Sequence, residues 1–267
     1  MTTALLIVDP QNDFCDGPAA GALPVPGAWA DMGRLAALVR RLDGRLDAIH
    51  VTLDSHHPLH IAHPVAWSDA QGAQPAPFTA ITAADVDAGG WRAHDPALRQ
   101  RYRAYIHRLD QAGAIAHTIW PPHCLIGSPG HAVQPELFAA LRAWEERHLS
   151  VVDYVLKGSN PHVEHFGALA AQMPDPDDPA TALNTALIGR LRQADRLLVA
   201  GEALNFCVMT TLTQLLGALP AAAAARITLL ADCTSPVPVP GHEQVVRDFL
   251  ADLTARGVTV ANGDGLF

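Results

Sequence analysis

Residues 201–216, GEALNFCVMTTLTQLL, join a strand pattern to a helix pattern. Before them, residues 197–200 form a short apolar run typical of a buried strand. After them, apolar residues recur at helical spacing, at Val208, Leu212, Leu215, Leu216 and Leu219. Cys207 therefore lies where a strand passes into a helix. It is either a small buried core residue or, because a helix N-terminus favours the thiolate, a nucleophile.

The same alternation runs along the whole chain. Short apolar runs occupy 4–8, 48–53, 151–156, 197–200, 227–230 and 258–261, and a run at 115–119 is either a strand or an extended loop. Stretches of helical period occupy 28–43, 133–147, 181–194, 206–219 and 242–256. This order predicts an α/β fold, Rossmann-like, with an open, mainly parallel six-stranded sheet and helices on both faces.

One segment, residues 64–112, interrupts the alternation with several prolines and glycines. It also contains a stretch from about 96 to 112 with the pattern of a helix. We therefore predict a single domain over 1–267 that carries an insertion at about 64–112. The insertion is expected to serve as a cap or as an oligomer contact.

Composition excludes several classes of protein. The 267 residues are 49% hydrophobic and 17% charged with a formal net charge of -9, which argues against disorder and against nucleic-acid or membrane partners. No apolar stretch reaches the ~18 residues of a membrane span. The first residues, MTTALLIVDP, lack the features of a signal peptide. The cysteine spacing shows no zinc ribbon or disulfide framework, and we expect a reducing, cytoplasmic location.

Chemically useful side chains follow or end the predicted strands. Asp9, Asp54 and Lys157 stand at three strand ends, and Cys207 follows a fourth. Each has a plain structural explanation, but parallel strands bring their carboxyl ends to one edge, where ligands bind. Together they predict acyl transfer through a thioester, with Cys207 as nucleophile, Asp9 as general acid and base, and Lys157 holding both by charge. Backbone N–H groups of the turn 203–207 would stabilise the oxyanion.

A second group of side chains lies in DSHHPLHIAHP, residues 54–64. Asp54, His56 and His60 occur there, with His57 and His63 beside them. A carboxylate with imidazoles is a ligand set for Zn²⁺, Fe²⁺ or Mn²⁺, and a solvated histidine-rich loop is the alternative. Further along, the segment IWPPHCLIGSPGH, residues 119–131, contains another histidine next to an aromatic side chain.

Five motifs resemble, in order, those of nicotinamidases within the isochorismatase-like cysteine hydrolases. They are LLIVDPQNDFC (5–15), DSHHPLH (54–60), WPPHCLIGSPG (120–130), VLKG (155–158) and GEALNFCV (201–208). The resemblance spans residues 5 to about 263 and leaves most of the insertion uncovered. It implies an amidase that hydrolyses nicotinamide to nicotinate and ammonia with a Cys207–Asp9–Lys157 triad. It also implies an oxyanion hole from the N–H groups of Ala203 and Cys207, next to a cis peptide after Glu202.

The resemblance further implies a divalent metal ion, with zinc expected and iron or manganese as alternatives. Asp54, His56 and His123 match its ligands, whereas His60 matches a position that binds metal in some members and only lines the site in others. The same resemblance implies Phe14 and Trp120 as the aromatic walls around the substrate ring. A small-molecule amide is the expected partner, and a homo-oligomer is the expected assembly.

Departures from the family pattern concern the substrate pocket. Glu202, Asn205 and Phe206 differ from the residues usual at their positions. Another small amide, a carbamoyl compound or a vinyl ether is therefore the alternative substrate, and a non-catalytic relative is a further alternative. Glu164 and His165 are predicted to be solvent-exposed, with a position lining the pocket as the alternative. Cys15 and Cys124 are predicted to pack in the core or beside the site, and Cys233 in the core or at a strand end.

Overall fold

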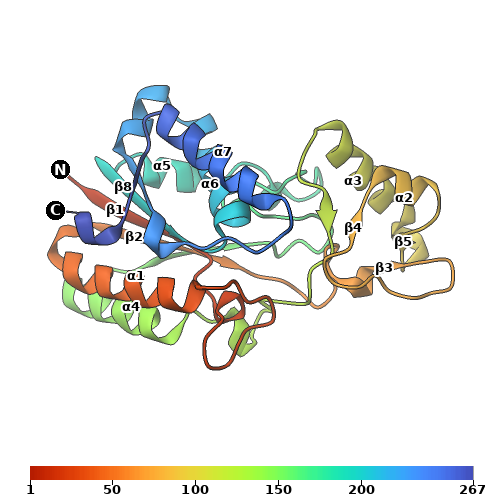
Figure 1. The fold of residues 1–267 in the computed structure, drawn as a ribbon, viewed down its shortest axis with the longest axis horizontal. Helices are drawn as coiled ribbons and strands as arrows, with labels where there is room; N and C mark the ends of the chain where they lie inside the picture. Colours follow the sequence, from red (N-terminus) through yellow and green to blue (C-terminus); the bar gives the residue numbers. More distant parts are fainter. Residues whose placement is uncertain (267) are drawn as a thin grey trace.

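The computed structural model describes residues 1–266, which build one six-stranded sheet and two small ones (Figure 1). The large sheet has the order β10-β9-β8-β1-β2-β7, and each neighbouring pair is parallel. Its strands are β1 (Thr3–Val8), β2 (Ala48–Asp54), β7 (Asp153–Lys157), β8 (Arg196–Gly201), β9 (Ile227–Leu230) and β10 (Thr259–Ala261). The predicted parallel sheet is thus confirmed. The run at 151–156 begins to pair with β2 only at Asp153, and the pairing extends to Lys157.

Helices cover both faces of this sheet (Figure 1). One face carries α1 (Ala28–Leu42) and α4 (Pro135–His148), and the other carries α5 (Thr185–Leu191), α6 (Met209–Ala218) and α7 (His242–Ala255). Leu5 and Ile7 of β1 pack into the first layer, while Leu6 and Val8 pack into the second. A strand buried on both faces reads as a continuous apolar run, which is why the sequence showed no alternation there. None of the helices within residues 1–266 has the length and apolar character that a membrane crossing requires.

The segment predicted as an insertion forms a separate unit beyond the carboxyl ends of the strands (Figure 1). It contains β3 (Trp67–Ser68), β4 (Ala80–Ile81), α2 (Ala83–Asp87), β5 (Arg92–Ala93) and α3 (Arg99–Gln111), and β6 (His117–Thr118) follows just beyond its predicted end. Trp67, Tyr102, Tyr105 and Ile106 are buried in a third hydrophobic cluster, which residues outside the segment, such as Val163, complete. The run at 115–119 therefore supplies β6, which pairs with β4 instead of joining the large sheet. Whether this unit serves as a cap or as an oligomer contact stays a prediction.

The junction around Cys207 differs from the single helix predicted at 206–219. Residues 204–208 form a π-helical turn, and α6 follows it. The backbone N–H groups of Phe206 and Val208 both donate to the Ala203 carbonyl, at 3.1 Å each. The peptide bond between Glu202 and Ala203 is cis, as the family resemblance implied. Gly201 has φ +113°, and a Cβ atom there would overlap the backbone of Val8, so the chain needs glycine at this close approach.

Candidate active site

Lys157 brings the residues of the strand ends together. Its Nζ atom lies 2.9 Å from Oδ2 of Asp9 and donates to Oδ1 of Asp54 at 3.0 Å. It also donates to Sγ of Cys207 at 3.7 Å and to the His165 carbonyl at 2.9 Å. All of these side chains are buried. The predicted convergence of the two acids, the lysine and the cysteine is therefore present, and their catalytic roles stay predictions.

Burial and neighbouring charges shift the pKa values in this cluster in opposing directions. Burial lowers the pKa of Lys157, but Asp54 and Asp9 outweigh it and hold that pKa well above its usual value. Burial works against ionisation of Asp54 as well, yet His56 and Lys157 hold its pKa well below the usual value. For Asp9 burial is the larger effect and raises the pKa, with the lysine opposing. A carboxylate with a raised pKa is a stronger base, as a proton acceptor for a thiol requires.

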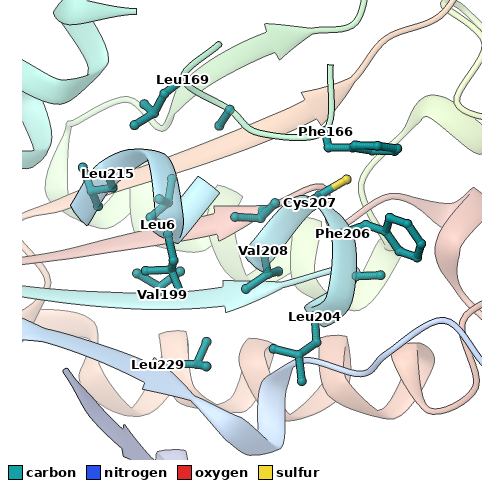
Figure 2. Close-up of a cluster of buried hydrophobic side chains, with 14 of the residues drawn as sticks. Leu6, Phe166, Leu169, Val199, Leu204, Phe206, Cys207, Val208, Leu215 and Leu229 are labelled. Atoms are coloured by element: carbon teal, nitrogen blue, oxygen red, sulfur yellow. The ribbon is translucent and has the colours of Figure 1, made fainter. Parts of the chain in front are cut away.

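The pKa of the Cys207 thiol is shifted in the direction opposite to the one expected at a helix N-terminus, which would favour the thiolate. Burial raises its pKa well above the usual value, more than the Lys157 ammonium lowers it, and a hydrogen bond with Asp9 raises it further. Figure 2 shows the side chain within a cluster of buried hydrophobic residues, with its sulfur directed away from Val208 and Val199 and toward Phe166. Removal of water from this position is the physical reason for the difference. The resting thiol is therefore protonated.

Aromatic side chains line the pocket in front of Cys207. Its walls come from the following residues: Phe14, Leu23, Asp54, Trp120, His123, Glu164, Phe166, Ala203, Phe206, Cys207 and Val237. The Trp120 ring meets those of Phe206 and Phe166 edge to face, with centroids 5.1 and 6.3 Å apart. The cavity holds about 30 Å³, room for roughly one water molecule.

Glu164 is buried and lines this pocket, so the predicted solvent exposure is wrong. Its Oε1 atom accepts a hydrogen bond from the His165 N–H at 3.0 Å, and burial raises the pKa of its carboxyl. The Glu164 N–H donates to the Tyr105 hydroxyl of α3 at 2.9 Å. The insertion thus covers the loop after β7. Local sequence carried no signal of this cover, because the covering residue lies 59 positions away. His165 is buried too.

Asp54, His56 and His123 form a group of buried metal-ligand side chains. Their ligand atoms all lie within 4.8 Å of one another. Oδ2 of Asp54 lies 3.0 Å from Nε2 of His56 and 3.5 Å from Nε2 of His123. His60 is buried beside them, with its ring centroid 4.3 Å from that of His56, but it lies outside this group.

The hydrogen bonds of these histidines fit a metal ion. The Nδ1 atom of His56 lies 3.1 Å from the Gly158 carbonyl, and that of His123 lies 2.8 Å from the Pro121 carbonyl. A carbonyl only accepts, so each Nδ1 donates to it, and a ring that is neutral then presents an Nε2 lone pair to Asp54. With no metal ion between them, Asp54 raises the pKa of His56, so that Nε2 of His56 can carry a proton as well. Lone pairs facing a carboxylate need a cation between them. A divalent ion satisfies all three side chains without protonating two buried rings.

We expect Gly158→Ala to weaken metal binding although it changes no ligand. Gly158 has φ +79°, and an added Cβ would lie 2.8 Å from both Oδ1 of Asp54 and Cε1 of His56. Displacing ligands in this way costs about 10–100-fold in affinity. Gly72→Ala is the matched control, because its φ is +88° and no atom of residues 1–266 lies within 4 Å of the added carbon. Competition with a chromophoric chelator measures both dissociation constants, and equal values would contradict the prediction.

Known proteins resemble this chain in sequence and in fold. No family model matches the chain. The nicotinamidase of Escherichia coli (strain K12) is 26% identical over 215 residues, which are 80% of this chain and 76% of that protein. A yeast nicotinamidase solved with the inhibitor nicotinaldehyde has a TM-score of 0.63 and 20% identity, covering 98% of this chain and 100% of that one. A pyrazinamidase of Pyrococcus horikoshii, solved in complex with zinc, has a TM-score of 0.56 and 19% identity over 98% of this chain and 99% of that one.

The fold and the site define a class: an α/β protein with a cysteine, an aspartate and a lysine clustered at the carboxyl edge of a parallel sheet, beside a candidate metal site. Similar proteins of known sequence and structure point to one group within this class. In sequence the chain is similar to the nicotinamidase of Escherichia coli, and it shares the fold of solved nicotinamidases and of a pyrazinamidase.

Proposed function

We propose that this protein is a metal-containing cysteine amidohydrolase that converts nicotinamide to nicotinate and ammonia. The observation that carries the proposal is the position of Lys157, which contacts Asp9 and Cys207 on one side and Asp54 of the metal-ligand group on the other. A nucleophile and a metal site joined through one lysine can act on a single small substrate. The aromatic pocket between them suits a planar ring.

In the proposed reaction, the carboxamide carbon of the substrate lies against Sγ of Cys207. Asp9 takes the thiol proton as sulfur forms a bond to that carbon, and the N–H groups of Ala203 and Cys207 stabilise the oxyanion. The C–N bond then breaks, Asp9 returns the proton to the leaving nitrogen, and ammonia departs from a thioester. Asp9 next takes a proton from a water molecule as the water oxygen forms a bond to the thioester carbon. The C–S bond then breaks, the sulfur takes the proton back from Asp9, and the acid product leaves as nicotinate after losing its proton to solvent. Lys157 stays charged throughout and orients both partners.

The remaining site residues would hold the substrate ring. Phe14 and Trp120 would flank it. A divalent ion, which we propose to be zinc, with iron or manganese as alternatives, would be held by Asp54, His56 and His123 and would supply a Lewis-acid position for a ring nitrogen lone pair. The relative solved with zinc supports that choice of metal.

Ammonia release from a panel of amides tests the proposal. Metal-loaded protein should hydrolyse nicotinamide, and benzamide should react about 10²-fold more slowly or worse, because it lacks the ring nitrogen and leaves a polar site unpaired. Hydrolysis of a carbamoyl compound in place of nicotinamide would support the alternative substrate class. Release from no member of the panel, by folded and metal-loaded protein, would favour a non-catalytic relative.

We further propose that the whole chain acts as one hydrolase domain in which the segment at 64–112 caps the site. Two contacts support this. Val163, from the loop after β7, packs in the hydrophobic cluster of the segment, and Tyr105 of α3 accepts the hydrogen bond from Glu164. A homo-oligomer and a cytoplasmic location stay predictions.

A further inference from the structure

His60 and His63 lie beside the metal-ligand group and have buried ring nitrogens with no hydrogen-bond partner. Both side chains are fully buried, and within residues 1–266 nothing hydrogen-bonds to Nε2 of either ring. The His63 centroid lies 5.5 Å from that of His56, 5.7 Å from that of His123 and 5.3 Å from that of His60. An unpaired buried polar atom is costly and requires an explanation. A ligand that both rings face would provide one.

The two rings differ in which nitrogen carries the proton. Nδ1 of His63 lies 3.2 Å from the Pro58 carbonyl, which can only accept, so Nδ1 donates and Nε2 of the neutral ring has a lone pair. His56 and His123 show the same arrangement. His60 is reversed, because the Ala62 N–H donates to its Nδ1 at 3.2 Å. The proton of neutral His60 therefore sits on Nε2, and an N–H group cannot bind a metal ion.

The spacing of the rings also fits His63 as a ligand. Two imidazoles bound to one ion at about 2.1 Å, at a tetrahedral angle, have centroids about 5 Å apart. The centroid of the His63 ring lies 5.5 Å from that of His56 and 5.7 Å from that of His123, slightly more than this distance. Nε2 of His63 lies outside the group whose ligand atoms are all within 4.8 Å of one another, so an inward shift of the ring must accompany binding.

We propose that His63, and not His60, is the additional imidazole ligand of the metal ion, and that His60 presents an N–H to a group bound in the site. The proposal rests on the proposed function, since it takes Asp54, His56 and His123 to hold the metal. It differs from the expectation drawn from the family resemblance, which pointed to His60.

Two matched variants test this assignment. In His63→Asn the side-chain amide can still donate to the Pro58 carbonyl, but the Nε2 lone pair is lost. In His60→Asn the amide oxygen can still accept from the Ala62 N–H, and Nε2 is lost likewise. Titration with cobalt(II) gives the dissociation constant and the ligand-field absorption spectrum of each. We expect His63→Asn to raise the Kd about 10–100-fold or more and to change the spectrum, with both unchanged in His60→Asn.

The opposite pattern would make His60 the ligand and overturn the proposal. No effect of either variant, or an equal loss in both, would also overturn it. Thermal unfolding of the metal-free proteins checks that each variant folds, and if His63→Asn does not, His63→Gln replaces it in the same comparison. Wild-type protein that takes up no cobalt would overturn both this inference and the metal in the proposed function. The expected cobalt pattern without amide hydrolysis would leave the inference standing and reject only the substrate.

Discussion

Cys207→Ala should abolish ammonia release, lowering kcat by about 10⁴-fold or more, because removal of a nucleophile leaves only binding and oxyanion stabilisation. The fold should persist, since the sulfur is directed away from Val208 and Val199 and the change removes one atom (Figure 2). The other cysteines, at 15, 124 and 233, are buried and free, and burial raises their pKa values. They are not expected to substitute for Cys207. A coupled assay for ammonia, at equal concentrations of folded protein, makes the measurement.

Cys207→Ser is the informative control for this prediction. It keeps an atom from which Asp9 can take a proton, but a hydroxyl is far harder to ionise than a thiol, so we expect a rate near that of the alanine variant. Cys15→Ala should retain activity and shows whether loss of another buried thiol matters. Substantial turnover by Cys207→Ala would rule out the nucleophile assignment. The proposed reaction would then need another attacking group.

Lys157→Met should destabilise the protein by about 3–5 kcal/mol, because removing one partner of a buried ion pair leaves uncompensated charge. Here the lysine faces two carboxylates, Asp9 at 2.9 Å and Asp54 at 3.0 Å, and all three side chains are buried. Methionine has a similar length and no charge, so lost packing contributes little. Denaturant unfolding of metal-free protein near pH 7 measures the free energy of unfolding.

An exposed ion pair provides the matched control for this substitution. Arg103 lies 2.6 Å from Asp87, and both side chains are exposed. Arg103→Met should therefore cost less than about 1 kcal/mol. A second control adds Asp9→Asn to Lys157→Met, which removes one of the two unpaired carboxylates and should recover part of the lost stability. Similar losses for the buried and exposed pairs would show that Lys157 does not hold the charge balance of the site.

Local sequence was sufficient for the large sheet and for the residues at its edge. Apolar runs such as 4–8 and 197–200 are buried on both faces, and that pattern needs no knowledge of distant neighbours. Parallel strands place their carboxyl ends together, so the strand pattern by itself predicts that Asp9, Asp54 and Lys157 meet. The predicted ends of the strands were less accurate, because pairing with the neighbouring strand decides where a strand such as β7 begins.

The protonation of the site residues and the burial of Glu164 could be read only from the tertiary structure. Cys207 and Lys157 are 50 positions apart, and only their burial in a common site shows that desolvation outweighs the ammonium and keeps the thiol protonated. Glu164 is buried because Tyr105 of a distant helix covers its loop. The proton positions of His60 and His63 likewise follow from backbone groups that the folded loop presents to each ring. These properties arise from through-space electrostatics and packing, which the order of residues does not reveal.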